Sequence, residues 1–292
     1  MAETANRVVE APLVPPSGNS GLLEVFRRRY LLKLLVRREL SARYQGSFLG
    51  IFWSYIQPAV RLGMYYVVFA VIMGGRTENH AIHIFAGLVI VHYFTETFGA
   101  GTRSIMANKG LIKKMAVPRE MFPVASMLVS AYHVVPGMLL LTGFCVALGW
   151  SPDLVGVGAA LLGFAIVAVL GTALALVFSA ANVYFRDFGN IVQTLTQIVT
   201  FSVPMIYPYS MVADRFGAAA PYYLLNPVAE AVLLFQRGFW TGTTNDPAAT
   251  EKTDLPDHLF LIGFAHLGAA LVVLVLAQML FWKLEKKIPE RL

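Results

Sequence analysis

Charge and cysteine are scarce in this sequence. Asp, Glu, Lys and Arg together make up 14% of its 292 residues, whereas hydrophobic residues make up 57%. This composition lies far from the average of soluble globular proteins and indicates an integral membrane protein. The one cysteine, Cys145, cannot form a disulfide within the chain and falls inside an apolar run, where we expect it to be a small packing residue.

Motifs of nucleotide and metal binding are also missing. The sequence has no Gly-Lys dipeptide, and therefore no G-x-x-x-x-G-K-[ST] loop that could cradle the phosphates of ATP. It has neither C-x-x-C nor H-E-x-x-H, so no motif indicates a metal site. We therefore expect no catalytic residue, no metal and no cofactor in this chain. If ATP drives the protein, the nucleotide must be bound and hydrolysed by a partner subunit.

What the sequence does have is long apolar runs. A helix needs about 20 apolar residues to cross the hydrocarbon core of a bilayer. The runs show no period-2 alternation, which favours helices over a membrane barrel. The expected fold is all-α, with six transmembrane helices in one domain over residues 46–292. The predicted spans lie at about 51–74, 82–101, 122–148, 154–181, 189–209 and 259–282.

Two segments precede the first span. Residues 1–20 are polar, rich in proline and without a continuous apolar core, so we expect a disordered cytoplasmic tail rather than a secretory signal. The second segment is residues 21–45. In its residues 21–40, apolar side chains recur at helical spacing at Leu23, Phe26, Tyr30 and Leu34, between six cations. This pattern predicts an amphipathic helix in the headgroup layer. A simple orientation signal and an extension of the first span are the alternatives.

The cations are distributed unevenly around the six runs. Eighteen of the 23 Lys and Arg residues fall before the first run, between the second and third, between the fourth and fifth, or after the sixth. The positive-inside rule then predicts a multi-pass protein of the plasma membrane with both termini in the cytoplasm. Because orientation explains the basic N-terminal segment, we expect no nucleic-acid partner.

The longest segment between spans, residues 208–258, is expected outside. Residues 221–240 are amphipathic but too polar at Asn226, Glu230 and Gln236 to span, and predict short helices that dip into the outer leaflet or cover a pore mouth. The acidic residues of the following loop leave open a membrane-bound lipid-phosphate transferase, although they lack the close Asp pairing that would hold a divalent cation. In the fourth run, Gly171, Ala175 and Ser179 form a small-residue face that suits either packing within the chain or a dimer contact.

Three blocks of residues occur in order between about residues 30 and 240. The first block is Arg38-Glu39-Leu40, Arg43-Tyr44, Ser47, Leu49-Gly50, Trp53 and Pro58. The second is Asn108, Leu111-Ile112-Lys113-Lys114, Pro118-Arg119-Glu120 and Pro123. The third is Phe185-Arg186-Asp187, Ile191-Val192, Val203-Pro204-Met205-Ile206-Tyr207-Pro208, Asn226-Pro227 and Arg237. Together these blocks resemble the permease subunits of type-2 ABC transporters that export polysaccharides and polyol phosphates.

This resemblance implies a homodimer of six-helix permeases joined to two cytoplasmic ATPase subunits, which bind ATP and Mg²⁺. It further implies export of a polyprenyl-pyrophosphate-linked polysaccharide, as in exporters of O-antigen or cell-wall galactan. The sequence departs from the family's common pattern at two places, at Ala116-Val117 before the Pro-Arg-Glu block and at Gln57 before Pro58. Export of teichoic-acid-like polymers or of drugs therefore remains an alternative.

The cationic loop 103–120 is the expected contact with the ATPase, because its apolar residues alternate with lysines. The residues predicted to form it are Asn108, Lys109, Leu111, Ile112, Lys113 and Lys114. Arg37, Arg38 and Arg43 are predicted to bind the lipid pyrophosphate, since a guanidinium donates paired hydrogen bonds to phosphate. Pure anchoring of these arginines at the interface is the alternative.

Two predictions concern the interior of the spans. Aromatic faces would offer a sugar chain an apolar path, although packing is the alternative for each ring. The candidates are Tyr65, Tyr66, Phe69, Tyr93, Phe94, Phe98 and Phe201. Arg61 and Glu96 lie at similar distances from the turn that joins the first two runs, which predicts an ion pair between them within the membrane.

Overall fold

The computed structural model describes residues 21–72, 74, 77–114, 117–285 and 288, and these residues contain helices and turns but no strand. The tail expected over residues 1–20 lies outside them. The α-helices are α1 (Leu22–Arg27), α2 (Arg29–Tyr44), α3 (Trp53–Tyr65), α4 (His80–Ala107), α5 (Lys109–Ile112), α6 (Met121–Ala147), α7 (Leu154–Tyr184), α8 (Phe188–Phe201), α9 (Tyr209–Phe216), α10 (Ala220–Tyr223), α11 (Pro227–Phe239), α12 (Pro247–Asp254) and α13 (Leu259–Glu285). A π-helical segment, η2 (Tyr66–Ile72), continues α3, and short 3-10 turns occur at η1 (Gly50–Phe52), η3 (Gly217–Ala219) and η4 (Thr241–Thr243).

Four helices, α4, α6, α7 and α13, are long and apolar enough to cross a membrane. They coincide with the spans predicted at 82–101, 122–148, 154–181 and 259–282. The bent pair Tyr209–Tyr223 and Pro227–Thr243, with 116° between its helices, is a possible fifth. The remaining two predicted spans are shorter helices, because α3 has 13 residues before it turns π-helical and α8 has 14.

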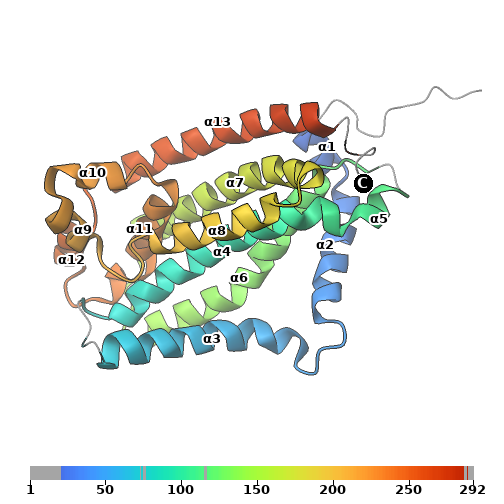
Figure 1. Cartoon of the computed structure of the whole chain (residues 1–292). Helices are drawn as coiled ribbons and strands as arrows, with labels where there is room; N and C mark the ends of the chain where they lie inside the picture. The colour runs from blue at the N-terminus through green and yellow to red at the C-terminus, as the bar shows by residue number, and fades with distance from the viewer. Residues whose placement is uncertain (1–20, 73, 75–76, 115–116, 286–287, 289–292) are drawn as a thin grey trace, which may run out of the picture.

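The long helices run side by side, and the two ends of the bundle differ (Figure 1). Helices α1, α2 and α5 and the end of α13 gather at one end, here called the α5 end. Helices α9, α10 and α12 gather at the opposite end, here called the α12 end. Helix α2 runs steeply across the α5 end instead of along the bundle. This is the direction expected of a helix that lies along a membrane surface.

Helix α7 is central, because it packs extensively on α4, α11 and α13. Small residues allow the close approach of α4 and α7: a Cβ on Gly101 would collide with Ala175, and one on Gly171 would lie 3.1 Å from a methyl of Thr97. The small-residue face predicted on this run is therefore used for packing within the chain. Ser179 on the same face is also buried.

At the α12 end, three helices begin with side-chain caps. Asp153 accepts from the Gly156 N–H at the start of α7, Asn226 from Val228 at α11, and Asp246 from Ala249 at α12, each at 3.0 Å. Such caps satisfy N–H groups that have no partner within the helix. They also fix where each helix starts, which positions the side chains described below.

The segment 221–240, which was expected to form short helices that dip into the outer leaflet or cover a pore mouth, contains α10 and α11. Nearly all residues of α11 are buried within the chain, Glu230 and Gln236 completely. The Gln236 amide donates to the carbonyl oxygens of Pro204 at 2.9 Å and His83 at 3.3 Å. These bonds give hydrogen-bond donors to two buried backbone carbonyl groups, one of them just after the end of α8. They explain why a polar amide lies in the core.

Helices α1 and α2 meet at a break at Arg28 and present two apolar faces. Val25, Leu32 and Leu35 are buried against the α5 end of the bundle. The stripe predicted from the sequence is the other face: Leu23 and Tyr30 are 71% and 73% exposed. An exposed apolar stripe among cations is the surface expected to face lipid headgroups and tails.

Candidate functional site

A pocket of about 360 Å³, lined by both polar and apolar residues, lies between α2, α3, α4 and α6. Helix α3 makes few contacts with α4 and leaves this space beside it. The corner between α2 and α3 is held by a contact of the Tyr44 hydroxyl with that of Ser54. The lining residues are Arg43, Tyr44, Ser47, Trp53, Ser54, Gln57, Pro58, Arg61, Phe85, Leu88, Val89, His92, His133, Val134 and Gly137.

Arg43, at the end of α2, connects the pocket to a carboxylate inside the bundle. Its Nη1 donates to Glu96 Oε1 at 2.5 Å and lies 2.7 Å from His133 Nδ1. The guanidinium is about half exposed, whereas the side chains of Glu96 and His133 are almost fully buried. His92, one turn before Glu96 on α4, places Nε2 3.6 Å from Glu96 Oε2. These four side chains are here called the Arg43 cluster.

The partner of Glu96 differs from the predicted one. Arg61 forms no hydrogen bond or ion pair with Glu96 or with any other residue in the described part of the chain. The prediction assumed two straight helices that remain in contact along their length. Because α3 diverges from α4, Arg61 lies on the pocket wall and the long side chain of Arg43 reaches Glu96 instead.

The three arginines predicted to bind pyrophosphate do not converge. Arg43 belongs to the Arg43 cluster, Arg37 is exposed, and Arg38 donates to the Asn108 side chain at 3.1 Å. The Asn108 amide also lies 3.4 Å from Glu39. Burial raises the pKa of the Glu39 carboxyl, against the opposing effects of Asn108 and Arg38. Arg38 thus connects α2 to the end of α4, next to the expected ATPase contact.

The segment expected to contact the ATPase is short. Helix α5 has four residues, and Leu111 and Ile112 are half-buried against the chain's own apolar cluster at the α5 end. Lys109, Lys113 and Lys114 are exposed. The apolar pair is therefore partly used within the chain, and the exposed surface of the segment is mainly cationic.

The seven predicted conduit aromatics separate into two groups. Tyr93, Phe94 and Phe98 on α4 are at most 3% exposed. Tyr93 stacks on Phe164 and Phe98 meets Phe178 edge-on, so these rings pack the core and do not line a path. Of the other four, Tyr65 and Phe69 stack on each other and are half-buried, while Tyr66 and Phe201 are 52% and 72% exposed.

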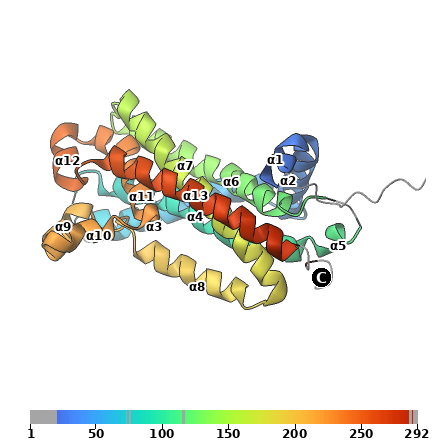
Figure 2. The same ribbon diagram turned by 90° about the horizontal axis from the view of Figure 1, so that it is seen from above.

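Helix α8 carries exposed polar side chains where a membrane helix would be expected to show apolar ones. It lies at the edge of the bundle (Figure 2) and packs on α4, with Val192 buried. Asn190, Gln193, Thr194 and Gln197 are exposed. Polar groups facing hydrocarbon are costly, so this face suits water or another protein surface.

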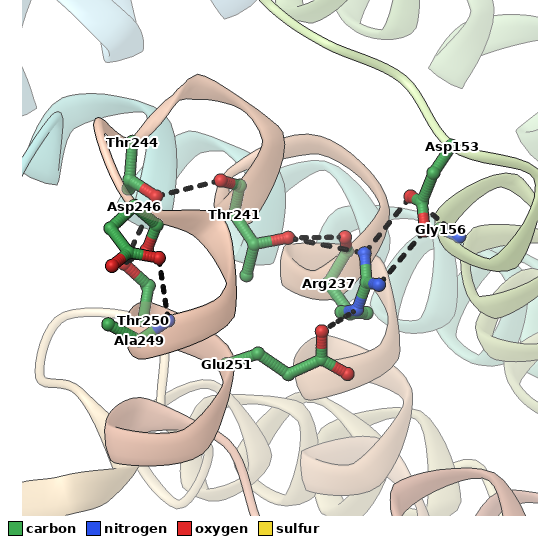
Figure 3. Close-up of polar contacts among 9 residues, drawn as sticks. All are labelled: Asp153, Gly156, Arg237, Thr241, Thr244, Asp246, Ala249, Thr250 and Glu251. Carbon is green, nitrogen blue, oxygen red and sulfur yellow. Dashed lines mark hydrogen bonds and ion pairs between the residues drawn. The ribbon is translucent and has the colours of Figure 1, made fainter.

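A second charged cluster, here called the Arg237 cluster, lies at the α12 end (Figure 3). The Arg237 guanidinium donates to both oxygens of Asp153 at 3.1 and 3.0 Å and contacts Glu251 at 2.8 Å. Hydrogen bonding to Arg237 holds the pKa of Asp153 below its usual range. The cluster joins α11 to the start of α7 and to α12.

Sequence reasoning did not single out the two histidines of the Arg43 cluster, His92 and His133. The available signal was their position within the spans: His92 lies four residues before Glu96, one helical turn away. Nothing in the sequence indicated that His133 of α6 would meet them. In the described ranges, no three His, Cys, Asp or Glu side chains are grouped to hold a metal ion.

Comparison with known proteins identifies the family. The model of the ABC-2 type transporter family matches residues 30–240. The chain is 31% identical over 219 residues to the O-antigen export system permease protein RfbA of Myxococcus xanthus, covering 74% of this chain and 83% of that protein. It is 27% identical over 216 residues to RfbA of Klebsiella pneumoniae, with 74% and 82% covered. It is 20% identical over 215 residues to the capsule polysaccharide export inner-membrane protein CtrC of Neisseria meningitidis serogroup B, with 73% and 80% covered. The chain therefore belongs to the ABC-2 type transporter family of membrane permeases.

Proposed function

We propose that this chain is the transmembrane subunit of an ATP-driven exporter that moves a polyprenyl-pyrophosphate-linked polysaccharide out across the plasma membrane. The names of its relatives, which refer to O-antigen and capsule polysaccharide export, support the substrate class. The absence of a phosphate-binding loop from the sequence supports a separate ATPase subunit, with ATP and Mg²⁺ bound there.

In this proposal the chain crosses the membrane six times, with both termini in the cytoplasm. Helix α3 with η2 forms the first span, and α8 with the non-helical residues after it forms the fifth. The α5 end is then cytoplasmic. This orientation agrees with the many cations there and places α2 across the inner headgroup layer.

The observation that carries the proposal is the pair of exposed polar surfaces on α8 and α3. Gln193 and Gln197 are exposed on α8, and Gln57 and Arg61 on α3. A single copy in lipid would leave them in hydrocarbon at considerable cost. A second copy of the chain would enclose them in a conduit suited to hydroxyl-rich sugars, with Tyr66 and Phe201 available for stacking.

The ATPase is proposed to dock at α5, where exposed lysines can pair with an acidic surface of that subunit and set how the two subunits are oriented. Arg38 and Asn108 lie beside this segment and connect it to α2. A shift of α5 on nucleotide binding would therefore move the helix that also carries Arg43.

Co-expression tests the proposal. The chain should co-purify with an ATP-binding cassette subunit encoded beside it, in a complex of two copies of each. Lipid-linked glycan should stimulate the ATPase activity of that complex. A stable, folded chain that binds no such subunit, or a complex whose ATPase activity is stimulated only by drugs, would contradict the proposal.

A further inference from the structure

An apolar groove of about 420 Å³ lies between α6, α7 and α11. Aliphatic and aromatic side chains and one glycine form its lining, and no charged residue is among the described residues there. The groove exists because α6 and α7, although consecutive in the chain, contact each other much less than either contacts α4. Val135, Val157 and Leu161 of the lining are exposed, so the groove is open at the side of the bundle.

The groove extends over the depth of about one leaflet. On α7 it reaches Phe164, ten residues after Leu154, where the helix begins. Ten helical residues rise about 15 Å, which is half of the roughly 30 Å of a hydrocarbon core. Both α6 and α7 are long and apolar enough to cross a membrane, so the open side of the groove faces hydrocarbon. A lipid chain that enters it can therefore stay in its own leaflet.

Aromatic contacts within the chain fix the walls of the groove. Phe164 stacks on Tyr93 of α4 with ring centroids 4.5 Å apart, and Trp150 stacks on Phe239 of α11 at 5.5 Å. Neither ring can turn to fill the space without losing its stacked partner. An apolar space of this kind does not hold water well, because water needs polar partners. A hydrocarbon chain would instead gain dispersion contacts with every wall.

The Arg237 cluster lies at the end of the groove nearest the α12 end. Arg237 directly precedes Gly238 of the lining, and Asp153 lies one helical turn before Val157. The cluster contains the carboxylates of Asp153 and Glu251 but a single guanidinium. The Arg237 side chain is 11% exposed, whereas those of the two carboxylates are 48% and 43% exposed. The surface beside the groove is therefore negative, which favours a lipid headgroup that carries a cation.

We propose that this groove binds an acyl chain of a phospholipid from the leaflet at the α12 end, with phosphatidylethanolamine preferred. The ammonium of that lipid donates hydrogen bonds to the carboxylates of Asp153 and Glu251. The trimethylated ammonium of phosphatidylcholine has no hydrogen to donate, and phosphatidylglycerol has no cation. The bound chain lies beside Phe235 and Phe239 and thereby holds α11 against α6 and α7.

Two other occupants match the groove less well. A second copy of the chain is assigned above to the polar faces of α8 and α3, and α6 lies on the opposite side of the bundle from α8 (Figure 2). A transported lipid would bring a pyrophosphate next to the exposed carboxylates of Asp153 and Glu251, where like charges repel.

The test titrates phospholipids into the full chain in detergent and counts the bound lipids by native mass spectrometry. The first phosphatidylethanolamine should bind at least threefold more tightly than the first phosphatidylglycerol or phosphatidylcholine. Val157→Phe places a ring in the groove and should weaken this binding at least fivefold. Val155→Phe, at an exposed position of α7 outside the lining, is the matched control and should leave the binding unchanged. Asp153→Asn should reduce the preference over phosphatidylglycerol to less than twofold.

A second variant obstructs the groove from the other wall. Ala131→Phe extends a ring into it from α6 and should weaken binding by a similar factor, while thermal unfolding separates a loss of lipid from a loss of fold. Folded Val157→Phe and Ala131→Phe variants that both bind phosphatidylethanolamine like the unmodified chain would overturn the site. Equal binding of phosphatidylglycerol would overturn the headgroup preference.

The other occupants give distinct results. Polyprenyl phosphate that displaces phosphatidylethanolamine at equal concentration would assign the groove to the transported lipid and overturn the proposed occupant. A Val157→Phe variant that separates two copies of the chain without weakening lipid binding would make the groove an interface between copies, which also overturns the proposal.

Discussion

Arg43 Nη1 lies 2.5 Å from Glu96 Oε1, which joins the last turn of α2 to the middle of α4. Arg38, five residues earlier on α2, contacts Asn108 just beyond the end of α4. Helix α2 is therefore attached to α4 at two levels. A displacement of α2 along the membrane surface would have to break or shift both contacts.

The pairing of Glu96 with Arg43, and not with Arg61, can be measured by double-mutant cycles. For Arg43→Gln and Glu96→Gln we expect a coupling of about 1 kcal/mol in the free energy of unfolding, modest because Arg43 is half exposed. For Arg61→Gln and Glu96→Gln the coupling should stay below about 0.5 kcal/mol. Thermal or denaturant unfolding in detergent gives both values. The reverse order of the two couplings would restore the pairing predicted from the sequence.

The lysines of the α5 segment should matter more for partner binding than for folding. Lys113→Glu with Lys114→Glu reverses two exposed charges and should abolish co-purification with the ATPase without lowering the unfolding temperature. Leu111→Asp with Ile112→Asp should abolish it as well but should also destabilise the chain, because both side chains are half-buried. Lys252→Glu, an exposed lysine on α12, is the matched control. A complex that survives the lysine reversals would exclude this docking surface.

The two groups of aromatic residues should respond differently to truncation. Tyr93→Ala removes a fully buried ring and should cost about 3–5 kcal/mol of stability. Tyr66→Ala and Phe201→Ala should change stability by less than about 0.5 kcal/mol, because both rings are exposed. If these rings line a conduit, their loss should still lower the amount of glycan that reaches the cell surface. Unchanged export in both exposed variants would remove them from the path.

The Arg237 cluster should make the α12 end sensitive to acid. The pKa of Asp153 is lower in the folded chain than its usual 3.8, so the unfolded chain binds more protons in this range. The stabilisation is complete above about pH 4 and is lost as the pH falls through the depressed folded value. Since Asp153 is about half exposed, the loss should be about 0.5–1 kcal/mol.

Asp153→Asn is the informative variant here, because asparagine still caps α7 but carries no charge. Its unfolding temperature should fall less between pH 5 and pH 3 than that of the unmodified chain. Equal falls in both proteins would show that the ion pair with Arg237 does not stabilise the fold.

The sequence predicted the long helices well because their apolar runs are continuous. It failed where local polarity and tertiary packing oppose each other. Helix α8 ends at Phe201, before Pro204, and α3 turns π-helical after Tyr65, so neither run forms one long helix. Helix α11 looked too polar to span, yet it packs inside the chain, where the Gln236 amide donates to backbone carbonyl oxygens that lie next to it only in the folded chain.

The candidate site was predictable in composition but not in its pairing. Counting residues from the turn between the first two predicted spans gave Arg61 and Glu96 similar depths in the membrane. That count cannot show that α3 diverges from α4. Arg43 looked like a headgroup contact alone, because the sequence gives no sign that α2 turns back toward the bundle. His133 reaches the cluster through the packing of α6 on α4, a contact across 37 residues.

The most direct test of the proposed function is transport by the complex reconstituted in sealed proteoliposomes. Lipid-linked polysaccharide is supplied on the side where the ATPase is exposed, and its appearance on the other side is followed with a membrane-impermeant glycosidase. We expect transfer that requires ATP and both subunits, and that stops when the ATPase cannot hydrolyse ATP. Transfer that proceeds without ATP, or hydrolysis that is stimulated by the glycan without any transfer, would contradict an ATP-driven exporter.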